Sequence, residues 1–85
     1  MGLDSVEIVL DVEDAFQIDI SDEEARKVFT VGELYNLILS KIDVQEQNRK
    51  QDVWELLCKI VVRILGVKPE LVTPEARFVQ DLRMD

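Results

Sequence analysis

The chain has 85 residues, of which 47% are hydrophobic and 33% are charged, a composition typical of one small soluble globular domain. All of its net charge of −8 lies in residues 1–43, which hold eleven acidic and three basic residues, whereas residues 44–85 hold seven of each. This asymmetry argues against nucleic acid or an anionic membrane as a partner and favours basic proteins. An acidic face that meets only solvent is the alternative.

The first predicted element is an amphipathic helix from about Asp4 to Phe16, capped by Asp4 or Ser5. Beside the apolar face that would meet the core, it carries an acidic stripe and a second apolar stripe. A core needs only one apolar stripe, so the second one predicts a docking surface for a basic partner with an apolar centre. The alternative is a helix packed between two others. The three stripes are Ile8, Val9, Val12, Ala15 and Phe16; Asp4, Glu7, Asp11 and Asp14; and Leu3, Val6 and Leu10.

Two further helices are predicted after an extended connector at 17–20. Ser21 is followed by three acidic residues, which predicts a capped short helix from Asp22 to about Val28, with Phe29 at its end. Thr30 and Glu33 have the spacing of a capping box, which predicts a third helix to about residue 42. The buried positions of these helices are predicted to be Ala25, Val28, Leu34, Leu37, Ile38 and Ile42.

The second half of the chain begins with residues 43–52, which are almost wholly polar and are predicted to be a linker or a helical extension. The strongest helical pattern covers about Asp52 to Leu65 and ends at Gly66. Residues 67–85 are predicted to form a long loop with short turns at Pro69 and Pro74. The apolar residues expected to bury this half are Val53, Leu56, Leu57, Ile60, Val61 and Ile64 on the helix, and Val67, Leu71, Val72, Phe78, Val79 and Leu82 in the loop.

Catalysis and metal binding find little support. The chain has no histidine, which excludes Ser-His and Cys-His pairs and removes the commonest metal ligand. Cys58 is the single cysteine, which fits a reducing compartment, and its place in an apolar helical pattern predicts a buried thiol. The acidic segment 19–24 lacks the glycine and the ligand spacing of a calcium loop. We therefore expect no enzyme, no metal site and, without a signal peptide or membrane-spanning run, a cytoplasmic protein.

Two groups of motifs resemble the acyl carrier protein family, in reversed order. Val6-Glu7-Ile8-Val9, Glu13-Asp14-Ala15-Phe16 and Ile20-Ser21-Asp22-Glu23-Glu24-Ala25 resemble the family's second helix and the loop after it. Leu65-Gly66-Val67, Val72-Thr73, Ala76-Arg77-Phe78 and Val79-Gln80-Asp81-Leu82 resemble its first helix and long first loop. The resemblance implies a small all-α four-helix bundle, three longer helices and one short, circularly permuted. Residues 1–85 would form one domain: 1–42 as family helices II to IV, 43–52 as the polar linker, and 53–85 as helix I with its loop.

The resemblance also locates the residue that carries the family's prosthetic group. The family's serine is followed by Leu, two residues and Val-Glu, which places its slot at Gly2, before Leu3 and Val6-Glu7. Gly-Leu-Asp-Ser at 2–5 imitates the attachment motif, so Ser5 is the fallback attachment site. In that register, however, Val-Glu follows three residues too early. Ser5 as a helix cap needs no such chemistry.

In the family, 4′-phosphopantetheine on the serine holds acyl groups as thioesters in fatty acid, lipid or polyketide biosynthesis. With glycine in the slot, we expect the cofactor to be absent from this chain. The implied partners are phosphopantetheinyl transferase and acyl-processing enzymes with basic surfaces. Partner contacts are expected at Leu3, Asp4, Val6, Glu7, Leu10, Glu13, Asp14 and Asp85, and an acyl cavity among Val9, Val12, Phe16, Ala25, Leu37 and Ile64.

Three alternatives follow from the sequence. The first is the permuted carrier fold without its serine, expected to be a monomer. The second is a working carrier modified at Ser5. The third is a non-carrier interaction module, or a fragment of tandem carrier domains whose halves pair between molecules as a domain-swapped dimer.

Overall fold

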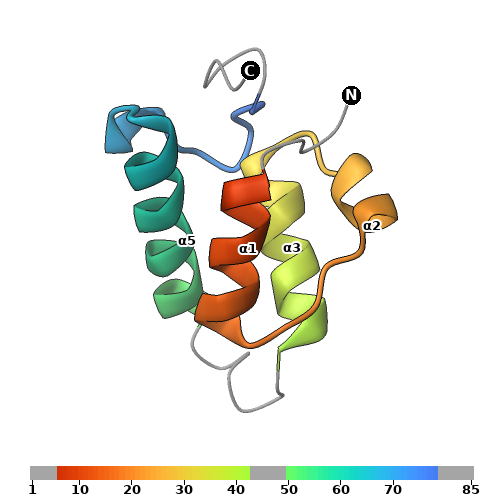
Figure 1. Ribbon diagram of the computed structural model, residues 1–85. Coiled ribbons are helices and arrows are strands. Elements are labelled where there is room, and N and C mark those ends of the chain that lie inside the picture. Colours follow the sequence, from red (N-terminus) through yellow and green to blue (C-terminus); the bar gives the residue numbers. More distant parts are fainter. Residues whose placement is uncertain (1–5, 43–49, 79–85) are drawn as a thin grey trace.

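Four α-helices and one 3-10 turn make up the residues that the computed structural model describes, 6–42 and 50–78 (Figure 1). The helices are α1 (Val6–Phe16), α2 (Asp22–Arg26), α3 (Val31–Lys41) and α5 (Lys50–Leu65), and the turn is η1 (Pro69–Leu71). Within these residues the only extended pairing is an isolated bridge between Thr30 and Arg77. The predicted all-α fold of three longer helices and one short one is therefore confirmed.

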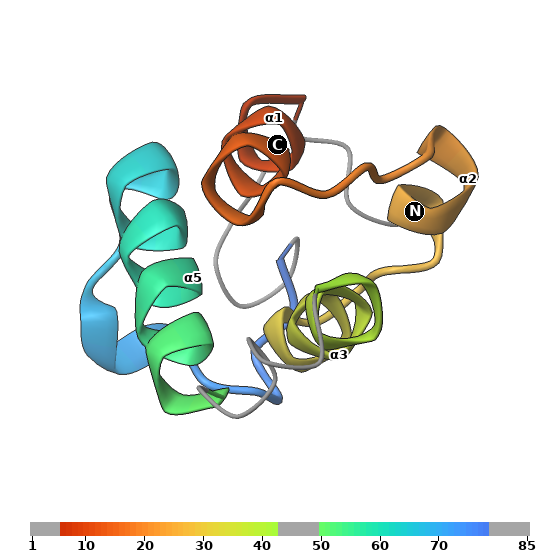
Figure 2. The same cartoon turned by 90° about the horizontal axis from the view of Figure 1, so that it is seen from below.

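The longer helices form the body of the bundle. Helix α5 packs against α1 and α3, and it runs in the opposite direction to both (Figure 1). Seen from below, α1 and α3 lie between α5 on one side and α2 on the other (Figure 2). None of the described helices is long and apolar enough to cross a membrane.

One hydrophobic core joins the first and second halves of the described chain. Its fully buried side chains come from α1, α3 and α5, and Phe78 of the C-terminal segment is the largest of them, with 1% of its surface exposed. The fully buried residues are Ile8, Val12, Val31, Leu34, Ile38, Leu57, Val61 and Phe78. Burying such side chains contributes about 1.5 to 3 kcal/mol each, so this shared core is the main source of stability.

Local sequence signals fix the helix ends as predicted. The Ser21 hydroxyl accepts from the amide of Glu24 at 3.1 Å, and the Glu24 carboxylate accepts from the amide of Ser21 at 3.0 Å. Thr30 and Glu33 form the same reciprocal pair at 3.1 and 3.0 Å. Each box satisfies amides that the first helical turn leaves without a partner. Gly66 follows α5 with a φ of 68°, the left-handed conformation that glycine adopts at low cost.

The segment after η1 completes the N-terminus of α3. The amides of Val31 and Gly32 donate to the carbonyls of Ala76 and Pro74, both at 2.9 Å, and the amide of Phe78 donates to the carbonyl of Phe29 at 3.0 Å. The segment therefore crosses from η1, beside α5, to the start of α3 (Figure 1). These bonds hold Phe78 at the core.

Several boundaries and burial predictions were wrong. Helix α2 ends at Arg26, two residues early. Helix α5 begins at Lys50, two residues before the predicted start, so residues 50–52 follow the predicted alternative of a helical extension. Ala15 is exposed, and Leu56 and Leu71 keep 38% and 49% of their surface exposed. Ala15 and Leu56 lie at the edges of their helical stripes, about 60° or more from the stripe centre, where the neighbouring helices do not reach. Leu71 ends η1 and lies on the outside of the turn.

Other predictions lie outside the described residues. These are the cap at Asp4 or Ser5, most of the linker, and the packing of Val79 and Leu82. At the second proline, the structure has a turn closed by the amide of Ala76 and the carbonyl of Thr73 at 3.0 Å.

Replacing Gly32 with alanine should destabilise the fold. A Cβ at this position would lie 2.7 Å from the carbonyl oxygen of Pro74, so the docked segment must shift. We expect the free energy of unfolding in urea to fall by about 1 to 3 kcal/mol. Asn36→Ala, one turn further along the exposed side of α3, is the matched control and should change it little. Equal stability of Gly32→Ala and the parent would contradict the close approach.

The Glu24 carboxylate should make stability depend on acid. The amide of Ser21 and then the Lys41 ammonium, 2.9 Å away, hold the pKa of Glu24 below its usual value. Its contribution is therefore fully present above the ordinary glutamate pKa of about 4.3 and is lost as the pH falls through the lower, folded value.

Chemical unfolding between pH 7 and pH 2.5 measures this dependence. The loss of stability on acidification should be smaller in Glu24→Gln than in the parent. Glu23→Gln removes a neighbouring carboxylate that makes no hydrogen bond or ion pair among residues 6–42 and 50–78, and it should keep the parent's loss. The same acid dependence in Glu24→Gln and the parent would rule out this role.

Candidate functional site

Helix α1 exposes an apolar side chain between two carboxylates. Leu10 keeps 57% of its surface exposed, and Glu7 and Asp14 are exposed as well. At about 100° per residue these three residues lie within about 60° of each other on the helix, opposite the buried Ile8 and Val12. We call Glu7, Leu10 and Asp14 the outer face of α1. Because Leu10 meets solvent, the alternative that α1 is packed between two other helices on this side is wrong.

The acidic residues beside the outer face are engaged within the fold. Asp11 forms an ion pair with Arg63 of α5. The Glu13 carboxylate accepts a hydrogen bond from the amide of Ile20 at 2.8 Å. By contrast, the carboxylates of Glu7 and Asp14 make no hydrogen bond or ion pair in the part of the chain that the structure describes. On α1, the acidic side chains without a partner in the described part of the chain therefore lie on the outer face.

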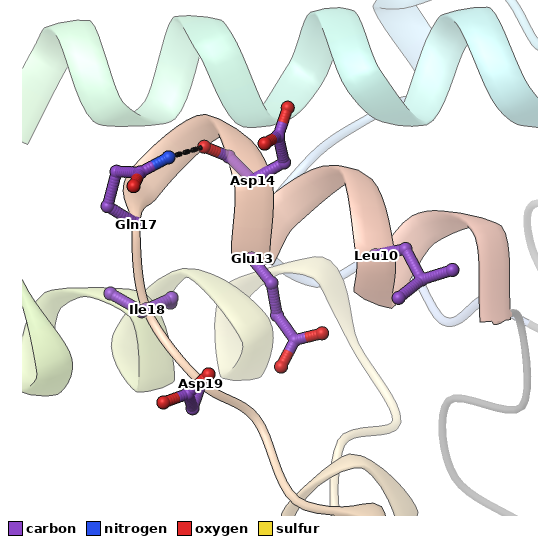
Figure 3. A pocket seen from close by; sticks show the side chains of 6 residues that line it. All are labelled: Leu10, Glu13, Asp14, Gln17, Ile18 and Asp19. Carbon is purple, nitrogen blue, oxygen red and sulfur yellow. Dashed lines mark hydrogen bonds between the residues drawn. The ribbon is translucent and has the colours of Figure 1, made fainter.

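An open hollow of about 410 Å³ adjoins the outer face at the end of α1 (Figure 3). The chain reverses there at Gln17, whose φ of 56° is left-handed, and the Gln17 side-chain amide donates to the carbonyl of Asp14 at 2.6 Å. Among the described residues, three carboxylates and no basic side chain line the hollow, so it extends the negative surface. Its lining residues are Leu10, Glu13, Asp14, Gln17, Ile18 and Asp19.

The structure brings together only some of the residues predicted for partner binding. Glu7, Leu10 and Asp14 share the outer face, and Glu13 borders it. Val6 is the first residue of α1, but its side chain is not among those described. The remaining predicted positions, Gly2, Leu3, Asp4, Ser5 and Asp85, lie outside the described residues.

Sequence reasoning missed Gln17, Ile18 and Asp19 as lining residues. The alternation of Ile18 and Ile20 predicted an extended connector, and both side chains are buried. Nothing in the pattern showed that the connector folds back along α1, because this depends on the left-handed Gln17 and on Glu13 binding the amide of Ile20.

The residues predicted to shelter an acyl chain all belong to the single hydrophobic cluster or pack against it. Val12 and Ala25 are buried, whereas the other four are half-buried: Val9, Phe16, Leu37 and Ile64. Leu37 also lines a second open hollow, of about 400 Å³, between α2 and α3. Two glutamates that border this hollow, Glu24 and Glu33, are already bound in the capping boxes.

The described residues hold no group of three or more His, Cys, Asp or Glu side chains placed to bind a metal ion. Cys58 is half-buried, rather than fully buried as predicted. Burial, and secondarily the nearby Glu55, raise the pKa of the Cys58 thiol, which disfavours the nucleophilic thiolate.

Comparison with known proteins finds similarity to an acyl carrier protein. No protein-family model matches the chain, and no solved structure matches it. The chain is 51% identical over 40 residues to the acyl carrier protein of Picosynechococcus sp. (strain PCC 7002). The match covers 47% of this chain and 49% of the relative, so the chain spans about half the length of the curated relative it matches. This identity, which extends over about half of each chain, and the all-α fold both agree with the resemblance to acyl carrier proteins read from the motifs.

Proposed function

We propose that the chain is a scaffold of the acyl carrier type that docks basic partner enzymes through α1 and is not itself an enzyme. The observation that carries this proposal is the outer face, on which the exposed Leu10 lies between two carboxylates without partners among the described residues. The similarity to an acyl carrier protein supports a docking role for this face.

The outer face defines the chemistry of the partner. Glu7 and Asp14 are seven residues apart, which separates them by about 10 Å along the helix axis. A fitting partner therefore has two cationic side chains about 10 Å apart on either side of an apolar pocket for Leu10. The charges steer association and set orientation, whereas burial of Leu10 contributes most of the affinity. Phosphopantetheinyl transferase and acyl-processing enzymes of fatty acid or polyketide biosynthesis are the proposed partners.

The attachment position does not fit the family's prosthetic group. A phosphodiester to 4′-phosphopantetheine needs a side-chain oxygen, and the glycine at position 2 has no side chain. We propose that the chain therefore keeps the partner surface and the half-buried apolar residues near an acyl site but holds no cargo. Ser5 has a hydroxyl and is the alternative attachment residue.

We also propose that the motifs occur in circularly permuted order within one domain covering residues 1–85. Two observations support this. The start of α1 and the end of the coloured segment that follows η1 lie at the same end of the bundle (Figure 1). The segment before Phe78 binds α3 within the same chain. A domain-swapped dimer would make the same bonds between two chains, so sedimentation at several concentrations should show a monomer if the proposal is right.

Intact mass tests the carrier proposal directly. The parent, Ser5→Ala, Gly2→Ser and the Gly2→Ser/Ser5→Ala double variant are each incubated with coenzyme A and a broad-specificity phosphopantetheinyl transferase. We expect no mass gain in the parent, and gain of one phosphopantetheine in both variants that carry Gly2→Ser, because they restore the hydroxyl in the family's register.

Two results would contradict the proposal in different ways. Mass gain in the parent that disappears in Ser5→Ala would make the chain a working carrier modified at Ser5. No gain in any variant, with each shown to be folded by circular dichroism, would mean that the transferase does not recognise this surface.

A further inference from the structure

We propose that Glu13 is a positioning residue, not a docking contact: its carboxylate holds the connector between α1 and α2 against the last turn of α1. This inference rests on the proposed function. It distinguishes the acidic residues of α1 that shape the docking surface from those that contact the partner.

Glu13 binds the connector at two points. Its backbone carbonyl accepts from the amide of Ile18 at 3.1 Å, and its side-chain Oε2 accepts from the amide of Ile20 at 2.8 Å. The first bond closes the helix after the left-handed Gln17. The second reaches seven residues along the chain to a partly buried amide, where a charged acceptor forms a strong hydrogen bond.

The two bonds fix side chains on both sides of the connector. Ile18 and Ile20 are held in the core, with 9% and 7% of their surface exposed, and the intervening Asp19 therefore faces outward. Asp19 lines the hollow beside the outer face. Without the Glu13 carboxylate, the amide of Ile20 would lose its acceptor. The connector, which carries Asp19 beside the hollow, would then no longer be held in its position.

The direction of the side chains separates Glu13 from Asp14. Glu13 points from α1 toward the connector, whereas Asp14 leaves the helix on the opposite side (Figure 3). The two residues are adjacent and carry the same charge, but within residues 6–42 and 50–78 only the carboxylate of Glu13 makes a hydrogen bond. Charge alone, as read from the sequence, could not distinguish them.

Two substitutions of Glu13 distinguish the effect of its hydrogen bond from the effect of its charge. Glu13→Gln keeps an oxygen acceptor for the Ile20 amide but removes the charge. Glu13→Asp keeps the charge but shortens the side chain by one methylene, which withdraws the oxygen from the amide. Asp14→Asn is the matched control, because it removes a neighbouring charge that makes no bond to the connector.

The first readout is the rate of hydrogen exchange at the Ile20 amide, measured by NMR in variants that keep Gly2. We expect protection in Glu13→Gln and Asp14→Asn to stay within about threefold of the parent, and protection in Glu13→Asp to fall by about tenfold or more. Unchanged protection in Glu13→Asp would overturn the positioning role.

The second readout is the rate of phosphopantetheine transfer to the same variants in the Gly2→Ser background, at low ionic strength. Glu13→Gln should transfer at close to the Gly2→Ser rate, whereas Asp14→Asn should be slowed several-fold. A loss in Glu13→Gln equal to that in Asp14→Asn would show that Glu13 is a docking contact and overturn the inference. If no variant is modified, the proposed function fails, while the exchange experiment still decides whether Glu13 holds the connector.

Discussion

The N-terminus of α3 is closed by backbone from the other end of the described chain. Its first two amides, of Val31 and Gly32, donate to carbonyls of the C-terminal segment. The amide of Glu33 donates to the Thr30 hydroxyl, and the amide of the cap residue Thr30 donates to the Glu33 carboxylate. All four amides that a helix start leaves unpaired are thus satisfied. The segment held by these bonds also carries Phe78 into the core. The packing of the C-terminal segment on α3 therefore depends on a close approach at Gly32, where a Cβ would force the segment to shift.

Contacts within the domain also determine which acidic side chains of α1 remain available at its surface. Asp11 is bound by Arg63 and Glu13 by the amide of Ile20, so two acidic residues stabilise contacts inside the domain. Among the described residues, the carboxylates of Glu7 and Asp14 make no such contact, and they lie one on each side of the exposed Leu10 along the helix. The outer face thereby presents a specific arrangement of two charges and one apolar side chain, which is the kind of surface that a basic partner with an apolar pocket can recognise.

Local chemistry made much of this fold predictable. Ser21 and Thr30 begin helices, and Gly66 ends one, because caps act within a few residues of themselves. Burial at stripe edges was not predictable, because exposure of Ala15 or Leu56 depends on how far the neighbouring helices reach. The outer face was predicted from the helical pattern, but the engagement of Glu13 was not, since its partner Ile20 is set by a backbone reversal that no motif announces.

An NMR titration of the 15N-labelled parent protein with a phosphopantetheinyl transferase, in the absence of coenzyme A, would show directly whether a partner binds the outer face of α1. We expect chemical-shift changes centred on Glu7, Leu10 and Asp14, and we expect them to weaken as salt is raised because charges contribute to association. Changes confined to α5 or to the hollow between α2 and α3, or no changes at all, would contradict the claim that the outer face of α1 is the surface that partners recognise.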